Sequence, residues 1–325
     1  MPIFDQGYRH WEGELAGHAW RWWAITRRGV LAQIKNKWVV LTILSAWMFA
    51  LVLAVFVILW GLIERQSQLV APLLSMIARD LPVDVASDPS QIRSLVWTFA
   101  FNGFFTAKMF LIMLLVALVG PDLISQDLRF NAMPLYLSRP LRRFDYFLGK
   151  GGVIGAYLLA AAIVPVIIAY LVGIGFSVDF EVVRQSLPIL LGSLAYGSIV
   201  VVSAATLMLA LSSLSKNSRH VTALWVGLWI VSYLVSAALT AMVRKDWCAL
   251  FSYTRNLHRL HHALLGTGAA WEKTKALFGG RIDLEPALII GDTHPWQWSA
   301  AVLLGLFGVS VWILATRVKS LDRLR

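Results

Sequence analysis

The chain has 325 residues, of which 58% are hydrophobic and 14% are charged. A soluble domain carries about 25% charged residues, so most of this chain faces something other than water. The formal net charge of +11 does not predict nucleic-acid binding, because the basic residues gather at the ends of apolar runs, where they face cytoplasm and anionic lipid. The single cysteine, Cys248, excludes an internal disulfide and a metal site made of thiolates alone.

Residues 1–37 precede the first apolar run and combine tryptophans with cations. Both side-chain types fit the headgroup region of a bilayer, where an apolar body and a polar tip are satisfied together. The segment therefore predicts an interfacial helix on the cytoplasmic face, and a partly ordered tail is the alternative. The apolar run that follows is about twice as long as the core of a signal peptide, so we expect it to remain in the membrane.

Six apolar runs are long enough to cross a bilayer, which takes roughly 20 residues of helix. Backbone groups in lipid must be satisfied within their own segment, so these runs are predicted to be α-helices. The sequence thus predicts an all-α polytopic membrane protein whose six-helix transmembrane domain covers residues 38–316. The runs are Trp38–Leu62, Leu95–Val119, Val153–Phe176, Leu187–Leu211, Val221–Val243 and Trp298–Thr316.

The positive charge that flanks these runs predicts the topology. Cations before Trp38 place the start of the first span in the cytoplasm, and alternation then places residues 121–150 inside. The basic tail, residues 317–325, also falls inside, so both termini are predicted to be cytoplasmic in a multi-pass protein of the cell (inner) membrane. Residues 244–295 fall outside by parity although they are rich in Lys and Arg, and long connections translocate with a weaker dependence on charge.

The connection 244–295 is too long and too apolar for a simple loop. Cys248–Leu265 and Ala269–Phe278 are predicted to be short helices that pack on the outer face of the membrane or dip partly into it. Three histidines, His258, His261 and His262, share one helix face and could ligate a metal ion. We expect packed or interfacial histidines and no metal, because the remaining histidines are scattered.

Lys108 lies near the middle of the second apolar run, about 12 residues from either end, or roughly 18 Å along a helix. An intramembrane charge normally faces protein or a wet cavity. Its partner would be a backbone carbonyl, Asn102, another subunit or an anionic substrate, so Lys108 and Asn102 are predicted to belong to a substrate path. The alternative is a span that begins later and leaves Lys108 near the outer surface.

Catalytic motifs do not occur in the sequence. GxxxxGK[ST], GxSxG and HExxH are absent, and the spans contain no convergent acid and base. The chain is therefore not expected to be an enzyme by itself or to hold a cofactor.

The polar stretch Pro121–Lys150 lies between the second and third spans and is dense in charge. Ser125 is predicted to cap a helix that runs to about Met133, and the prolines that follow limit its length. A short helix with an apolar face, exposed on the cytoplasmic side, can insert into a groove of a partner protein. An amphipathic turn that faces lipid is the alternative.

Three residue runs in this stretch resemble the first cytoplasmic loop of ABC-2 type transporter permeases. They are Ile124–Asp127 (ISQD), where the coupling helix of that family begins, Leu137–Pro140 (LSRP), and Tyr146–Lys150 (YFLGK), which leads into the third span. The interfacial N-terminal helix, the six spans and the helices between spans five and six are also similar to that architecture.

The resemblance implies the permease subunit of a type V-like ABC exporter. It implies a separate ABC ATPase subunit that hydrolyses ATP with Mg²⁺, and a second permease chain, identical or paralogous. The alternative function is an ATP-driven force-transmitter or scaffold that acts on an extracytoplasmic partner protein, docked on residues 244–295, without carrying a solute. The residues that the resemblance implies for coupling to the ATPase are Ser125, Asp127, Leu128, Arg129, Phe130, Asn131, Leu135, Tyr136 and Arg139.

Overall fold

The computed structural model describes residues 20–70, 72, 89–132, 143–177, 179–278, 292 and 294–322. Every regular element in these ranges is helical, and six stretches are long and apolar enough to cross a membrane, which confirms the predicted all-α fold with six candidate spans. The stretches are α2 (Lys37–Glu64); α5 (Arg93–Val119) with α6 (Asp122–Arg129); α8 (Arg143–Leu158) with α9 (Val164–Phe176); α10 (Glu181–Leu214); α11 (Ser218–Val226) with α12 (Ser232–Val243); and α16 (Trp296–Asp322).

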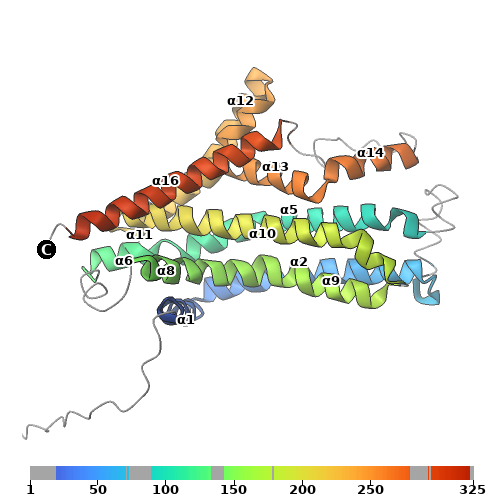
Figure 1. Cartoon of the computed structure of the whole chain (residues 1–325), viewed down its shortest axis with the longest axis horizontal. Helices are drawn as coiled ribbons and strands as arrows, with labels where there is room; N and C mark the ends of the chain where they lie inside the picture. Colours follow the sequence, from blue (N-terminus) through green and yellow to red (C-terminus); the bar gives the residue numbers. More distant parts are fainter. Residues whose placement is uncertain are drawn as a thin grey trace, which may run out of the picture.

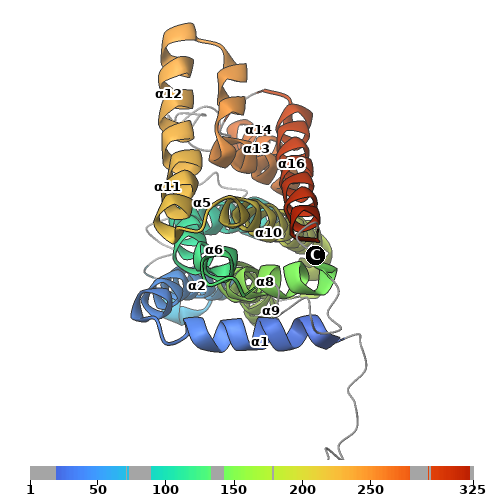
Figure 2. The ribbon, with the colours of Figure 1, turned by 90° about the vertical axis from the view of Figure 1, so that its left-hand side faces the viewer.

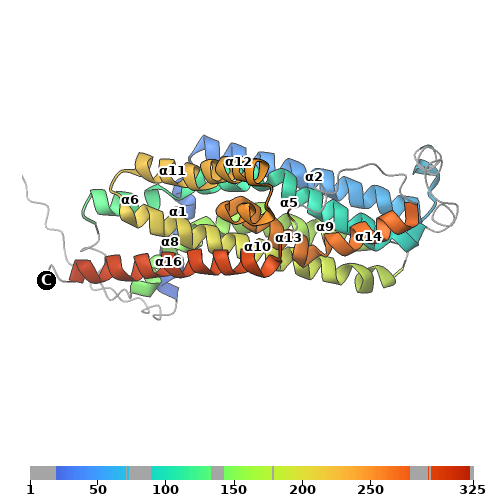
Figure 3. The same cartoon turned by 90° about the horizontal axis from the view of Figure 1, so that it is seen from above.

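The centre of the bundle is formed by α5 and α10, and the other spans surround them (Figures 1 and 3). In the most apolar part of α5 and of α10, 56% of the residues are buried inside the chain, against 11% for α11 with α12. The outer helices expose large apolar side chains such as Leu51, Leu171 and Trp312. Such continuous apolar surface belongs against lipid or another subunit.

One end of the bundle gathers α6, the start of α8, the end of α10 and the start of α11, and α1 (Arg21–Gln33) lies across it (Figures 1 and 2). The helix α1 packs on α8, and Thr26 Oγ1 donates a 2.9 Å hydrogen bond to the carbonyl of Gly149. A Cβ atom at Gly149 would lie 2.7 Å from Ile25 Cβ, so only glycine permits this approach. Asn36 then caps α2, because its side chain accepts from the Trp38 N–H at 3.0 Å.

Two spans contain a π-helical turn. Residues Leu159–Ile163 (η4) lie between α8 and α9, and Gly227–Val231 (η5) lie between α11 and α12. Such turns often mark functional sites within a helix. Beyond η5, α12 leans away from the bundle (Figures 1 and 2).

The connection from α12 to α16 contains η6 (Asp246–Phe251), α13 (Tyr253–Leu265) and α14 (Thr267–Phe278). The predicted helix Cys248–Leu265 is divided at Ser252, whose hydroxyl caps α13. The helix α13 packs between α10 and α16 (Figure 3), and Tyr253 Oη lies 2.9 Å from Ser203 Oγ, well inside α10. The sequence left two placements for this helix, on the outer face of the membrane or partly within it. In the structure α13 lies among the spans.

At the opposite end of the bundle, Arg93 joins three segments. Its guanidinium lies 2.7 Å from Glu64 at the end of α2 and 3.0 Å from Asp179 in the turn before α10. Arg93 and Glu64 are both buried, so their pairing satisfies two charges that would otherwise be costly. This contact fixes the ends of α2, α5 and α10 relative to one another.

Candidate functional site

The helix α6 begins four residues earlier than the sequence predicts, with Pro121 at the N-cap position, and it ends at Arg129. Ser125 is not its N-cap: it lies inside the helix, fully buried, and its Oγ donates back to the carbonyl of Pro121 at 2.5 Å. The predicted capping role of Ser125 is therefore wrong, and in this conformation its side chain is covered by the rest of the chain. Ser125 Oγ also lies 2.9 Å from Ser218 Oγ at the start of α11.

The N-terminus of α6 is capped by a residue from another helix. Ser212, near the end of α10, accepts the N–H groups of Ile124 at 3.1 Å and Ser125 at 3.0 Å, and donates to the carbonyl of Pro121 at 2.8 Å. The first N–H groups of a helix have no partner within the helix, so a hydroxyl placed there replaces a local cap. Two buried serines, Ser125 and Ser212, and the half-buried Ser218 thus join α6 to α10 and α11.

Asp127 joins α6 to α8. Its carboxylate lies 2.7 Å from Lys150 Nζ and accepts a 2.5 Å hydrogen bond from the Tyr146 hydroxyl. The Asp127 and Lys150 side chains are each only 13% exposed, so water screens the pair weakly. In this conformation the Asp127 carboxylate is therefore engaged within the chain.

The outer surface of α6 is formed by the side chains that these contacts leave exposed. Arg129 and Phe130 lie there, with the Arg129 guanidinium 5.6 Å from the Phe130 ring and Phe130 72% exposed. Asn131 follows the end of α6 and has a left-handed backbone, with φ 54°. Leu128 is half-buried against the core. Leu135, Tyr136 and Arg139 lie outside the described residues.

Lys108 is fully buried in the middle of α5, which begins at Arg93, so the alternative of a later span is wrong. Its ammonium donates to the carbonyl of Ala161, inside the π-helical turn η4, and lies 3.8 Å from the centre of the Phe104 ring. A backbone carbonyl was one of the four expected partners. Asn102, one and a half turns earlier, is also buried, and its Oδ1 has no protein partner among the described residues.

The histidines on α13 have separate surroundings. The His261 ring stacks on Tyr196 at 4.4 Å and meets Phe105 edge-on at 5.3 Å, whereas His262 Nδ1 lies 2.9 Å from Thr267 Oγ1. Burial lowers the pKa of His258 and lowers that of His262 to about 4, so both are neutral at pH 7. Within the described part of the chain, no three His, Cys, Asp or Glu side chains gather as metal ligands.

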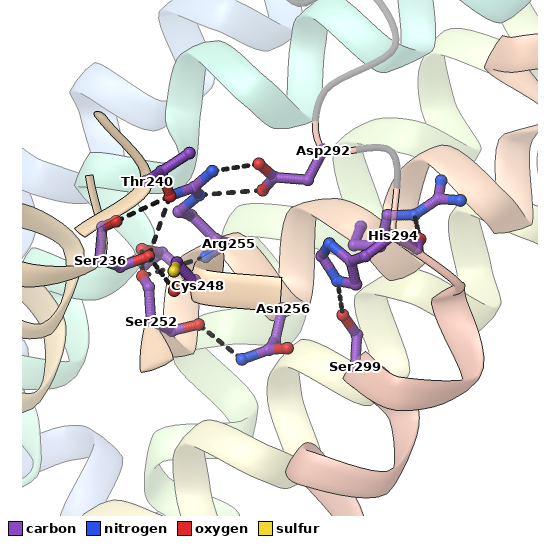
Figure 4. A network of polar contacts seen from close by, with 11 residues as sticks. Ser236, Thr240, Cys248, Ser252, Arg255, Asn256, Asp292, His294 and Ser299 are labelled. Carbon is purple, nitrogen blue, oxygen red and sulfur yellow. Dashed lines mark hydrogen bonds and ion pairs between the residues drawn. The ribbon is translucent and has the colours of Figure 1, made fainter. Parts of the chain in front are cut away.

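A network around Arg255 joins α12, α13 and the segment before α16 (Figure 4). The guanidinium of Arg255 forms a two-pronged ion pair with Asp292, with Nε at 3.0 Å, and donates to Ser236 Oγ at 2.9 Å and Thr240 Oγ1 at 2.8 Å. Nearby, His294 Nε2 lies 2.7 Å from Ser299 Oγ. The sequence analysis did not identify this network, because Arg255 and Asp292 are 37 residues apart.

The fold and the site together define a polytopic, six-span membrane protein with a short, firmly held helix at one end. Comparison of the chain with protein-family models and with curated proteins gave no match.

Proposed function

We propose that this chain is the membrane-spanning permease subunit of an ABC-2 type exporter and that α6 is its coupling helix. A separate ATPase subunit binds and hydrolyses ATP, and a second permease chain completes the pathway. The exporter lies in the cytoplasmic membrane, with the α6 end of the bundle on the cytoplasmic side. ATP-driven movement of the ATPase displaces α6, and the spans joined to α6 move with it.

The observation that carries this proposal is how α6 is held. Its base, the part that contacts other spans, is fixed by polar contacts, whereas its tip, the C-terminal end, is exposed. The base of α6 bonds to α10 through Ser212, to α11 through Ser125, and to α8 through Asp127. The tip presents Arg129 and Phe130. A force on the tip therefore reaches three spans besides α5, which continues directly into α6. An apolar ring beside a cation is suited to a groove on a partner.

Lys108 and Asn102 belong to the proposed path. In this conformation Lys108 is engaged with the Ala161 carbonyl, so the path between α5 and η4 is closed. Movement of α5 relative to α8 and α9 would release the ammonium toward an anionic group of a substrate. Such a change is a two-state rearrangement that nucleotide binding to the partner biases.

Charge reversal at the tip of α6 tests the coupling role. We expect Arg129→Glu to reduce co-purification with the ATPase and ATPase stimulation by about tenfold, because hot-spot contacts at interfaces cost at least 1–2 kcal/mol when lost. The matched control is Arg184→Glu, an exposed arginine near the opposite end of α10. Normal ATPase binding and stimulation by Arg129→Glu would contradict the proposal.

A second candidate is a force-transmitter that acts on an extracytoplasmic protein. One observation favours it: Met242, Trp247 and Phe251 are exposed at the protruding end of α12 and in η6. In that case an extracytoplasmic protein co-purifies with the chain, and replacement of these three side chains by serine removes it without affecting ATPase activity. If the variant with the three serines still co-purified with the extracytoplasmic protein, this candidate would be excluded.

A further inference from the structure

A groove between α10, α13 and α16 is separate from the α6 site and from Lys108. It encloses a cavity of about 630 Å³ that is open on one side. That volume lies within the roughly 300–1,000 Å³ of pockets that bind small ligands. Ala263 on α13 and Ala300 on α16 line it, and their small side chains leave the space between the helices.

The walls of the groove accept hydrocarbon. Among the described residues that line it, two carry hydroxyl groups, and both are engaged: Ser198 Oγ donates to the Leu194 carbonyl at 2.8 Å, and Ser203 Oγ lies 2.9 Å from Tyr253 Oη. A polar ligand would lose its hydrogen bonds to water in such a site without replacing them. Such walls favour an apolar occupant.

The groove opens on the surface that the spanning helices present to the bilayer. Both α10 and α16 are long and apolar enough to cross a membrane. Val202, Leu304 and Phe307 line the groove and are exposed. Lipid acyl chains are the apolar molecules in contact with such a surface, so they can enter the groove from the side.

A cation lies on α13 next to the residues that line the groove, directly before Leu260 and one turn before Ala263. Arg259 directly precedes Leu260, which lines the cavity, and its Nε donates to the His294 carbonyl at 2.5 Å, two residues before the lining residue Trp296. In the described ranges no carboxylate pairs with Arg259. Arg255, one turn earlier, differs, because its donors are engaged by Asp292, Ser236 and Thr240 (Figure 4).

Among the described residues, the neighbouring groups do not neutralise the charge of Arg259. Asp292 is held by Arg255 in a two-pronged pair. Burial lowers the pKa of His258 and of His262, so neither ring carries positive charge at neutral pH. A neutral imidazole also does not pair with the Arg259 guanidinium as an anion would. A guanidinium with free N–H groups is well matched to phosphate oxygens.

We propose that the groove binds an acyl chain of an anionic membrane phospholipid whose phosphate pairs with Arg259. The apolar walls hold the chain, and the guanidinium selects the negatively charged headgroup. The site does not depend on the proposed role in export, because it uses neither α6 nor an ATPase. A bound lipid would also fill the space between α13 and α16 and brace the two helices.

The test measures lipid binding to the purified, delipidated full-length chain by native mass spectrometry. The probes are phosphatidylglycerol and phosphatidylcholine with identical acyl chains. We expect the wild-type chain to bind one phosphatidylglycerol roughly tenfold more tightly than phosphatidylcholine, the factor of about one charge-assisted hydrogen bond. Arg259→Gln removes this preference, whereas Lys245→Gln, which removes an exposed cation outside the groove, keeps it.

A second variant tests the groove without changing charge. Ala300→Phe fills the cavity, so we expect it to weaken binding of both lipids while the chain still elutes as a folded species. Equal phosphatidylglycerol preference in Arg259→Gln and wild type would overturn the headgroup assignment. Undiminished lipid binding by Ala300→Phe would overturn the groove assignment. Loss of a dimer in Ala300→Phe, with lipid binding unchanged, would assign the groove to a second copy of the chain.

Discussion

Ser212 is the residue whose side chain does most to fix the position of α6. It serves three backbone groups at the start of that helix, all of them buried. The sequence predicted a local cap from Ser125, because a serine at the start of a polar helix usually plays that role. Ser212 lies 88 residues from Ile124 along the chain, so no local pattern could indicate it.

Removal of this cap should destabilise the chain. We expect Ser212→Ala to lower the free energy of unfolding by about 2 kcal/mol, because two buried N–H groups lose their acceptor. Ser198→Ala is the control on the same helix, since within the described part of the chain that hydroxyl bonds only to the Leu194 carbonyl of its own helix. Thermal unfolding in detergent measures both. Equal melting temperatures for the two variants would show that Ser212 is not a cap of this importance.

Charged residues in the apolar part of the chain were easier to identify than their partners. Lys108 was predicted as a buried cation from its place in the span, and it is buried. Its partner is the Ala161 carbonyl in a π-helical turn, and nothing in the sequence distinguishes that turn from ordinary helix. Asp127 lies in a stretch predicted to contact a partner, yet Lys150 and Tyr146 engage it within the chain.

At the scale of elements, the spans were predictable because their signal is length and apolarity. The six predicted runs all fall within the six observed stretches, which extend further at most ends. The helix α13 was predicted as an element, but its insertion between α10 and α16 depends on packing. A Cβ atom at Gly192 would lie 2.5 Å from the Leu264 carbonyl, so a glycine in α10 allows the approach.

The histidines on α13 should make stability depend on pH. The folded chain holds the pKa of His262 at about 4, below the ordinary 6.5, because the ring is desolvated. Between pH 4 and pH 6.5 the unfolded chain binds more protons at this histidine than the folded chain does. The free energy of unfolding is therefore at its full value above pH 6.5 and falls as the pH drops toward 4. His258 and His294 have pKa values lowered in the same direction.

We expect wild-type stability to fall by about 1–3 kcal/mol between pH 7 and pH 4.5, and His262→Gln to reduce this loss without abolishing it. Unfolding midpoints across this range provide the measurement, with His220→Gln as the exposed control. The same pH dependence in His262→Gln and wild type would exclude His262 as a contributor.

At the scale of the whole molecule, the connections of α6 explain how one short helix can influence the bundle. The central pair, α5 and α10, meets α6 directly, and the outer helices α8 and α11 are joined to it by polar contacts. Arg93 fixes the far ends of the central pair, α5 and α10, together with the end of α2. Displacement of α6 is therefore expected to tilt these spans at one end while their opposite ends stay together. Such a tilt would open one end of a path.

The most direct test of the coupling role is site-specific photo-cross-linking in native membranes. A photoreactive phenylalanine replaces Phe130, 72% exposed at the tip of α6, or Phe180, 89% exposed at the opposite end of α10. We predict that the Phe130 position cross-links to an ATPase with nucleotide-binding motifs and that the Phe180 position does not. No ATPase adduct at Phe130, or equal adducts at both positions, would contradict the assignment of α6 as the coupling helix.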